Sequence, residues 1–108
     1  MAQTKIGIDM ADIARFRALS RSSLVKLFSK REIARAKMYK DPAPHLAGMF
    51  AAKEAASKAL GTKQFPFFTL EIRHAKDGAP EVWKDGKKVR VSVSITHTRS
   101  LAAAIAVS

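Results

Sequence analysis

The segment from His45 to Leu60 constrains the fold more than any other, because its composition favours one long helix. It is rich in alanine, and its larger apolar residues recur three or four positions apart. Pro42 and Pro44 disfavour helical structure just upstream, and Gly61 follows where a C-terminal cap is expected. We therefore predict that the longest helix of the chain begins near His45 and ends at Leu60.

Shorter elements are predicted before this helix. Residues Lys5–Asp9 favour a strand that delivers Asp9 to its C-terminal end, and Ala11–Leu19 has helical composition. A second short helix is predicted over Arg21–Phe28. A third, which starts with the spacing of a capping box, should span Ser29–Tyr39.

The apolar period changes after the long helix. In Thr69–His74 two apolar residues alternate inward as in a strand, and Asp77-Gly78 and Asp85-Gly86 are turn signals. Two alternating runs follow, one at Val89, Val91, Val93 and Ile95 and the other at Leu101, Ala103, Ile105 and Val107. The predicted fold class is α+β, with an antiparallel sheet in a meander packed with one long and several short helices.

Length and composition favour a single domain over residues 1–108. The chain has 108 residues, of which 47% are hydrophobic, enough for one core. No stretch approaches the roughly 20 apolar residues that cross a bilayer, and no secretory signal is recognisable, so no membrane association and a cytoplasmic location are expected. Without cysteine, hard-cation or metal-free chemistry is what the composition allows.

The charge balance predicts an anionic partner. Lysine and arginine total 20 against 9 acidic residues, a formal net charge of +11. Nucleic acid, an acidic protein and a polyphosphate ligand would all be attracted by such a field. Charge alone does not choose among the three.

Two acids and two lysines are candidates for chemistry. Glu54 and Lys58 lie four apart on the predicted long helix, and Lys53 adjoins the acid. Asp9 ends the first predicted strand, and two carboxylates from separate elements can hold Mg²⁺ if the fold brings them together. Taken singly, a surface ion pair for Glu54 and Lys58 and a helix N-cap for Asp9 are the simpler interpretations.

A polar connection between the last two predicted strands is a further candidate. His97 lies there beside Ser94, Thr96 and Thr98, where a phosphate could accept several hydrogen bonds. The simpler interpretation is an ordinary turn histidine.

Four segments together resemble the holo-acyl-carrier-protein synthase family of 4'-phosphopantetheinyl transferases. The resemblance covers nearly the whole chain and is most specific around the Ala-Ala-Lys-Glu-Ala core and the Ser-Lys-Ala that follows it. The segments are Gly7-Ile-Asp9 with Ile13 and Arg15, Phe28 with Arg31-Glu32, His45–Thr62, and Ser92–Thr98. The resemblance implies the 4'-phosphopantetheinyl transferase fold and transfer of the phosphopantetheine arm of coenzyme A to a serine of acyl carrier protein.

The resemblance also implies roles for single residues. Asp9 and Glu54 would ligate Mg²⁺, or Mn²⁺, with Glu54 or a water as the base, and Lys58 and Lys53 would contact phosphate. The adenosine bisphosphate end of coenzyme A would meet Gly61, Thr62, Ser94 and His97. An acidic carrier protein would meet Arg15, Arg17, Arg21 and Lys26, and the family is usually a homotrimer with sites between subunits.

One position departs from the family pattern. An arginine is common just before the aromatic residue of the long helix motif, and this chain has Met49 there. One expected phosphate or adenine contact is therefore missing or comes from elsewhere.

Two rival functions agree with parts of the sequence. A nucleic-acid-binding module agrees with the charge and with the cluster Phe65, Phe67 and Phe68, but these flank Pro66 with only Lys63 nearby, unlike a stacking surface. A carrier-protein-binding homologue without catalysis is the other rival. The combination of both acids with Lys58 favours the enzyme.

Overall fold

The computed structural model describes residues 3–108, and its long helix is the one that the sequence predicts. The elements, in chain order, are β1 (Ile6–Asp12), α1 (Ile13–Arg17), α2 (Arg21–Leu27), α3 (Lys30–Ala36), α4 (Ala43–Leu60), the 3-10 helix η1 (Phe67–Thr69), β2 (Glu71–His74), β3 (Pro80–Lys84), β4 (Lys87–Lys88), β5 (Ser92–His97) and β6 (Leu101–Val107). Helix α4 begins two residues before the predicted start, and Gly61 caps it with a φ of 99°.

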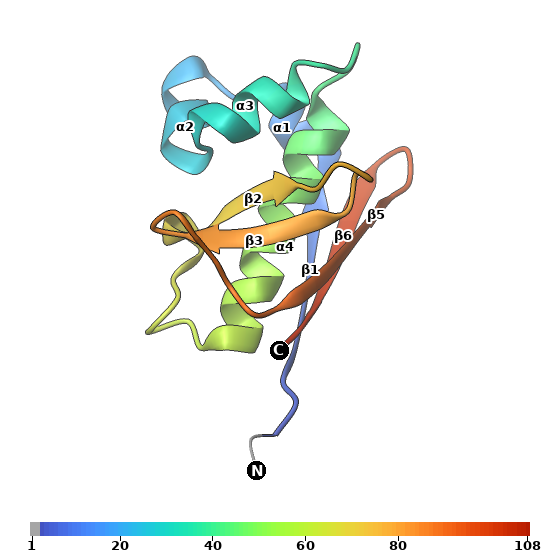
Figure 1. The fold of residues 1–108 in the computed structure, drawn as a ribbon. Helices are drawn as coiled ribbons and strands as arrows, with labels where there is room; N and C mark the ends of the chain where they lie inside the picture. Colours follow the sequence, from blue (N-terminus) through green and yellow to red (C-terminus); the bar gives the residue numbers. More distant parts are fainter. Residues whose placement is uncertain (1–2) are drawn as a thin grey trace.

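The strands form two three-stranded antiparallel sheets, ordered β1-β6-β5 and β2-β3-β4. Helix α4 packs against β1 and β6 and also contacts β5, β2 and η1. The three short helices gather at one end of the molecule, around the first half of α4 (Figure 1). The predicted α+β class is confirmed, and the predicted single sheet is divided in two.

The contact between α4 and the first sheet is made of small residues. Ala51, Ala55 and Ala59 of α4 are buried, as are Ala104 and Ala106 of β6. Small side chains on both sides bring the backbones close together.

Gly7 of β1 marks the closest approach to α4. A Cβ atom there would lie 1.9 Å from the carbonyl oxygen of Ala55, a distance that no side chain tolerates. Strand β1 can lie this close to α4 only because residue 7 is glycine.

The other face of the first sheet is apolar and exposed. Its side chains alternate with the buried ones, so the larger apolar residues of the last predicted strand point away from α4. The exposed apolar residues of β1 and β6 are Ile6, Ile8, Met10, Leu101, Ile105 and Val107. We call these six residues the apolar sheet face.

Several element boundaries before α4 differ from the predictions. Strand β1 does not end at Asp9 but continues to Asp12, because it keeps pairing with β6 as far as Leu101. Helix α1 therefore begins only at Ile13, and α3, which has the predicted capping box, ends at Ala36 rather than near Tyr39.

No helix within residues 3–108 has the length and apolar character to cross a membrane.

Candidate functional site

Asp9 and Glu54 approach each other where β1 crosses α4. Asp9 lies on the same side of β1 as Gly7 and Ala11, which face α4, and it is half-buried. Burial raises the pKa of the Glu54 carboxyl, and the negative charge of Asp9 raises it further. The charge of Asp9 thus acts on Glu54 across the contact between β1 and α4, and Lys58, four residues after Glu54 on α4, bonds to Asp9.

Asp9 does not cap a helix. Asp12 occupies the N-cap position of α1, and it makes no side-chain capping bond. The simpler interpretation of Asp9 from the sequence is therefore wrong.

Lys58 joins this pair from one turn farther along α4. Its ammonium group donates to the carbonyl oxygen of Ile8 at 2.9 Å and to Oδ1 of Asp9 at 3.3 Å. The ion pair thus links α4 to β1, and is not the pair with Glu54 that helix spacing alone suggests. We call Asp9, Glu54 and Lys58 the acid site.

Arg15 of α1 borders the acid site. Its guanidinium lies 5.2 Å from the Phe16 ring centroid and 5.1 Å from that of Phe50, and its charge lowers the pKa of Glu54, against the larger effect of burial. The acid site thus has two carboxylates and cations on two sides.

The donor set of the acid site fits a hard divalent cation. Within residues 3–108, no three histidine, cysteine, aspartate or glutamate side chains come together, so an ion here would take two protein carboxylates. Mg²⁺ favours such an incomplete protein cage, completed by water and phosphate oxygens. The close carboxylates, whose charges repel, are a reason for a cation to bind there.

Lys53 does not reach this site. Its side chain is 2% exposed, and its ammonium donates to Glu32 Oε1 at 3.0 Å and to the Leu27 carbonyl at 2.6 Å. Glu32 also accepts from the backbone amides of Ser29 at 2.9 Å and Ile72 at 2.8 Å. Within this chain Lys53 is therefore turned away from the acid site, and it ties α4 to α2 and α3 and, through Glu32, to β2.

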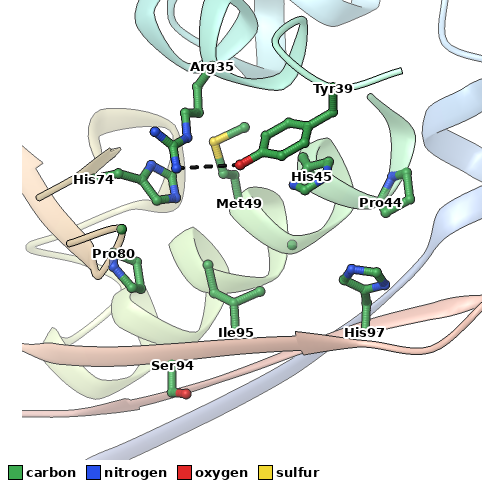
Figure 2. Close-up of a pocket in the computed structure, with 12 residues that line it drawn as sticks. Arg35, Tyr39, Pro44, His45, Met49, His74, Pro80, Ser94, Ile95 and His97 are labelled. Atoms are coloured by element: carbon green, nitrogen blue, oxygen red, sulfur yellow. Dashed lines mark hydrogen bonds between the residues drawn. The ribbon is translucent and has the colours of Figure 1, made fainter. Parts of the chain in front are cut away.

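A cavity of about 280 Å³ lies near the first half of α4. Side chains from α3, α4, the end of β2 and β5 line it, together with the turn before β3 (Figure 2). Its basic residues are Arg35, His45, His74 and His97. We call this cavity the cationic pocket.

The predicted nucleotide contacts separate into different places. His97 and Ser94 both line the cationic pocket. The His97 side chain points into the pocket, whereas the Ser94 side chain points to the other face of β5 (Figure 2). Ser94 pairs with Ile105 on the outer face of β5 and β6. Gly61 and Thr62 lie beyond the other end of α4, so within one chain these residues do not surround one ligand.

The predicted carrier-protein contacts are on the short helices. Arg15, Arg21 and Lys26 are exposed, whereas the Arg17 guanidinium donates to Asp41 at 2.6 Å. The charge of Arg17 is thus already paired within the chain.

Sequence reasoning missed Arg35, His45 and His74 as pocket residues. They come from three separate elements, so no spacing in the sequence connects them. The signals in the sequence that pointed here were His97 and Ser94 and the departure at Met49, which also lines the pocket.

The phenylalanine cluster packs mostly on the core. The Phe67 ring centroid lies 5.4 Å from that of Phe50, and Phe65 is half-buried beneath the Lys84 ammonium. Only Phe68 is largely exposed, at 67%. This arrangement offers no run of exposed aromatic rings for base stacking.

Residues 5–106 match the sequence pattern of the 4'-phosphopantetheinyl transferase superfamily. The holo-[acyl-carrier-protein] synthases of Chlorobaculum parvum and Clostridium acetobutylicum are 40% and 41% identical to this chain, over 94% of it and over 95% and 94% of their own lengths. A Bacillus anthracis holo-(acyl-carrier-protein) synthase crystallised with CoA (3',5'-ADP) superposes with a TM-score of 0.80 at 32% identity, over 95% of this chain and 93% of its own. The Helicobacter pylori synthase in complex with coenzyme A gives 0.79 at 31% identity, over 95% and 99%.

Proposed function

This chain belongs to the 4'-phosphopantetheinyl transferase superfamily, and from that premise we propose that it is a holo-[acyl-carrier-protein] synthase. It transfers the 4'-phosphopantetheine group of coenzyme A to a serine hydroxyl of apo-acyl carrier protein. Adenosine 3',5'-bisphosphate is the other product. The observation that carries the proposal is the acid site, where Asp9, Glu54 and Lys58 converge from β1 and α4.

The reaction exchanges one P–O bond for another. The serine oxygen bonds to the phosphorus that bears the pantetheine arm, the pyrophosphate P–O bond breaks, and the electron pair leaves on the adenosine bisphosphate. Catalysis of such a transfer depends on alignment and on neutralising phosphate charge. A divalent ion, Mg²⁺ or Mn²⁺, would be held by Asp9 and Glu54 and would supply part of that neutralisation.

Side chains of the acid site would provide the remaining charge neutralisation and accept the serine proton. Lys58, now paired with Asp9, is placed to share its charge with the departing phosphate. The raised pKa of Glu54 makes it a stronger proton acceptor than an ordinary glutamate. The serine proton passes to Glu54 or to a water beside it.

The nucleotide end of coenzyme A is assigned to the cationic pocket. His45 and Glu54 are nine positions apart on α4, about 14 Å at the helical rise of 1.5 Å per residue. We propose a homotrimer in which the pocket of one subunit completes the acid site of the next. The apolar sheet face supports this assembly, because six large apolar residues clustered on one surface favour burial against another subunit.

Acyl carrier protein is the acidic partner that the net charge of +11 favours. Arg15, Arg21 and Lys26 are exposed on α1 and α2 and would steer it. Such charges mainly raise association rates. Fatty acid biosynthesis in the cytoplasm is the setting we propose for this reaction.

The direct test incubates the protein with coenzyme A, Mg²⁺ and an apo-acyl carrier protein, and follows the mass of the carrier. We expect the mass of one phosphopantetheine arm to be added, and EDTA to abolish the reaction until Mg²⁺ or Mn²⁺ is restored. Tight binding of mixed RNA without any transfer would support the nucleic-acid module instead. Carrier binding without transfer would support the non-catalytic homologue.

A further inference from the structure

The cationic pocket has basic side chains from four elements. Arg35 comes from α3, His45 from α4, His74 from the end of β2 and His97 from β5. No aspartate or glutamate is among the described residues that line it. An anion entering the pocket would therefore meet only positive or neutral groups.

Arg35 has no carboxylate partner among residues 3–108. Its Nη2 donates a long hydrogen bond of 3.5 Å to the Tyr39 hydroxyl, and its side chain points into the pocket beside His74 (Figure 2). The neighbouring acid Asp41 is bound by Arg17. Arg35 thus keeps free donors while half-buried.

The electrostatics of the neighbouring histidines reflect the positive charge of the pocket. Burial is the main cause that lowers the pKa of His45 and of His74, and the positive charge of Arg35 lowers both further. A bound anion would remove this repulsion.

Met49 lies beside Arg35 in the same pocket. Its thioether carries no charge, and it occupies the position where the resemblance predicts an arginine. The guanidinium that is missing from α4 is therefore replaced in space by one that enters the same cavity from α3.

We propose that Arg35 is the specificity-determining residue for the 3'-phosphate of coenzyme A, in place of an arginine at position 49. This rests on the proposed function. Coenzyme A carries two separate anionic groups, a pyrophosphate and a 3'-phosphomonoester. The pyrophosphate contains the bond that breaks and belongs at the acid site, so the 3'-phosphate is the anion left for the cationic pocket.

The test compares coenzyme A with dephospho-coenzyme A, which lacks only the 3'-phosphate, as substrates of wild type and of Arg35→Ala. We expect the wild type to prefer coenzyme A, and the variant to raise KM for coenzyme A about 10- to 100-fold, as loss of a charge-assisted contact does. KM for dephospho-coenzyme A and kcat for both should stay within about twofold.

Two further variants make the result specific. Arg31→Ala removes the same charge one turn earlier on α3, where Arg31 faces Glu71 at 3.7 Å outside the pocket, and should leave the preference unchanged. Arg35→Ala with Met49→Arg should recover the preference, because the cation returns to the same cavity. Equal loss for both substrates, or a wild type indifferent to the 3'-phosphate, would overturn the proposal.

Direct binding separates this proposal from the proposed function. Calorimetry with adenosine 3',5'-bisphosphate and adenosine 5'-monophosphate measures the same preference without any transfer. A wild type that shows the preference but modifies no carrier would overturn the proposed function alone. A wild type that modifies the carrier with equal affinity for both nucleotides would overturn the role of Arg35 alone.

Discussion

The acid site and the cationic pocket differ in charge and in construction. The acid site mixes two carboxylates with a lysine and depends on one contact, where β1 lies against α4. The cationic pocket has one sign of charge and is assembled from four elements. The difference agrees with the proposed division of labour, in which the mixed-charge acid site would serve the transfer reaction and the cationic pocket would hold an anion.

The division of labour predicts that changes in the acid site act on kcat. Glu54→Gln removes a carboxylate while keeping its shape, and we expect kcat to fall about 10²- to 10³-fold, as after loss of one group that stabilises the transition state. KM for coenzyme A should change much less. Steady-state transfer rates at saturating carrier measure this, and an unchanged kcat in a folded variant would remove Glu54 from the chemistry.

The buried pair of Lys53 and Glu32 predicts the largest change in stability. Lys53→Met leaves the Glu32 carboxylate buried without its cation, so we expect the free energy of unfolding to fall by about 3–5 kcal/mol. Replacing both, with Glu32→Gln added, should recover part of that loss. Denaturant unfolding checks both variants. A Lys53→Met protein as stable as the wild type would contradict a stabilising role for the pair of Lys53 and Glu32.

Mixing inactive variants tests whether the two regions act in one chain or across subunits. Glu54→Gln and an Arg35→Ala, His97→Ala double variant are co-expressed and assayed at low coenzyme A. If each site is shared between neighbouring subunits and the two variants assemble randomly in equal amounts, about a quarter of the sites will combine an intact acid site with an intact cationic pocket. Sites contained within one chain would give no such recovery.

The smallest expected effect is a pH dependence of stability from the cationic pocket. His45 and His74 have a folded pKa below the ordinary value of 6.5, so the unfolded chain binds more protons near that pH. Their contribution is complete above 6.5 and is lost as pH falls through that value toward the folded pKa. We expect Tm to drop between about pH 7.5 and pH 5.5, and less steeply in His74→Gln. A variant as pH-dependent as the wild type would contradict this origin.

Sequence reasoning predicted contiguous features best. Helix α4 and the capping box at Ser29 both followed from local spacing. Adjacent residues on a helix point about 100° apart, so Lys53 is buried while its neighbour Glu54 stays partly exposed, a difference that the motif alone does not reveal.

Features that depend on tertiary packing were not predictable in the same way. The end of β1 is set by its pairing with β6, and the membership of Arg35 and His74 in one pocket is set by how α3 and β2 pack. The apolar sheet face could not be predicted from the sequence. Strand β6 has small apolar residues on one side and larger ones on the other, so no alternation of polar and apolar residues shows which side is buried.

Gly7 makes the acid site and the cationic pocket differ in how far they tolerate mutation. The separation of the two acids is held by a backbone contact at a residue with no side chain, so mutation cannot adjust it by small steps. Even one added methyl group would force the strand from the helix, whereas under our proposal the distant pocket can exchange one arginine for another and still bind the same phosphate. Accumulated mutations should therefore change ligand recognition by this protein before they change the reaction that it catalyses.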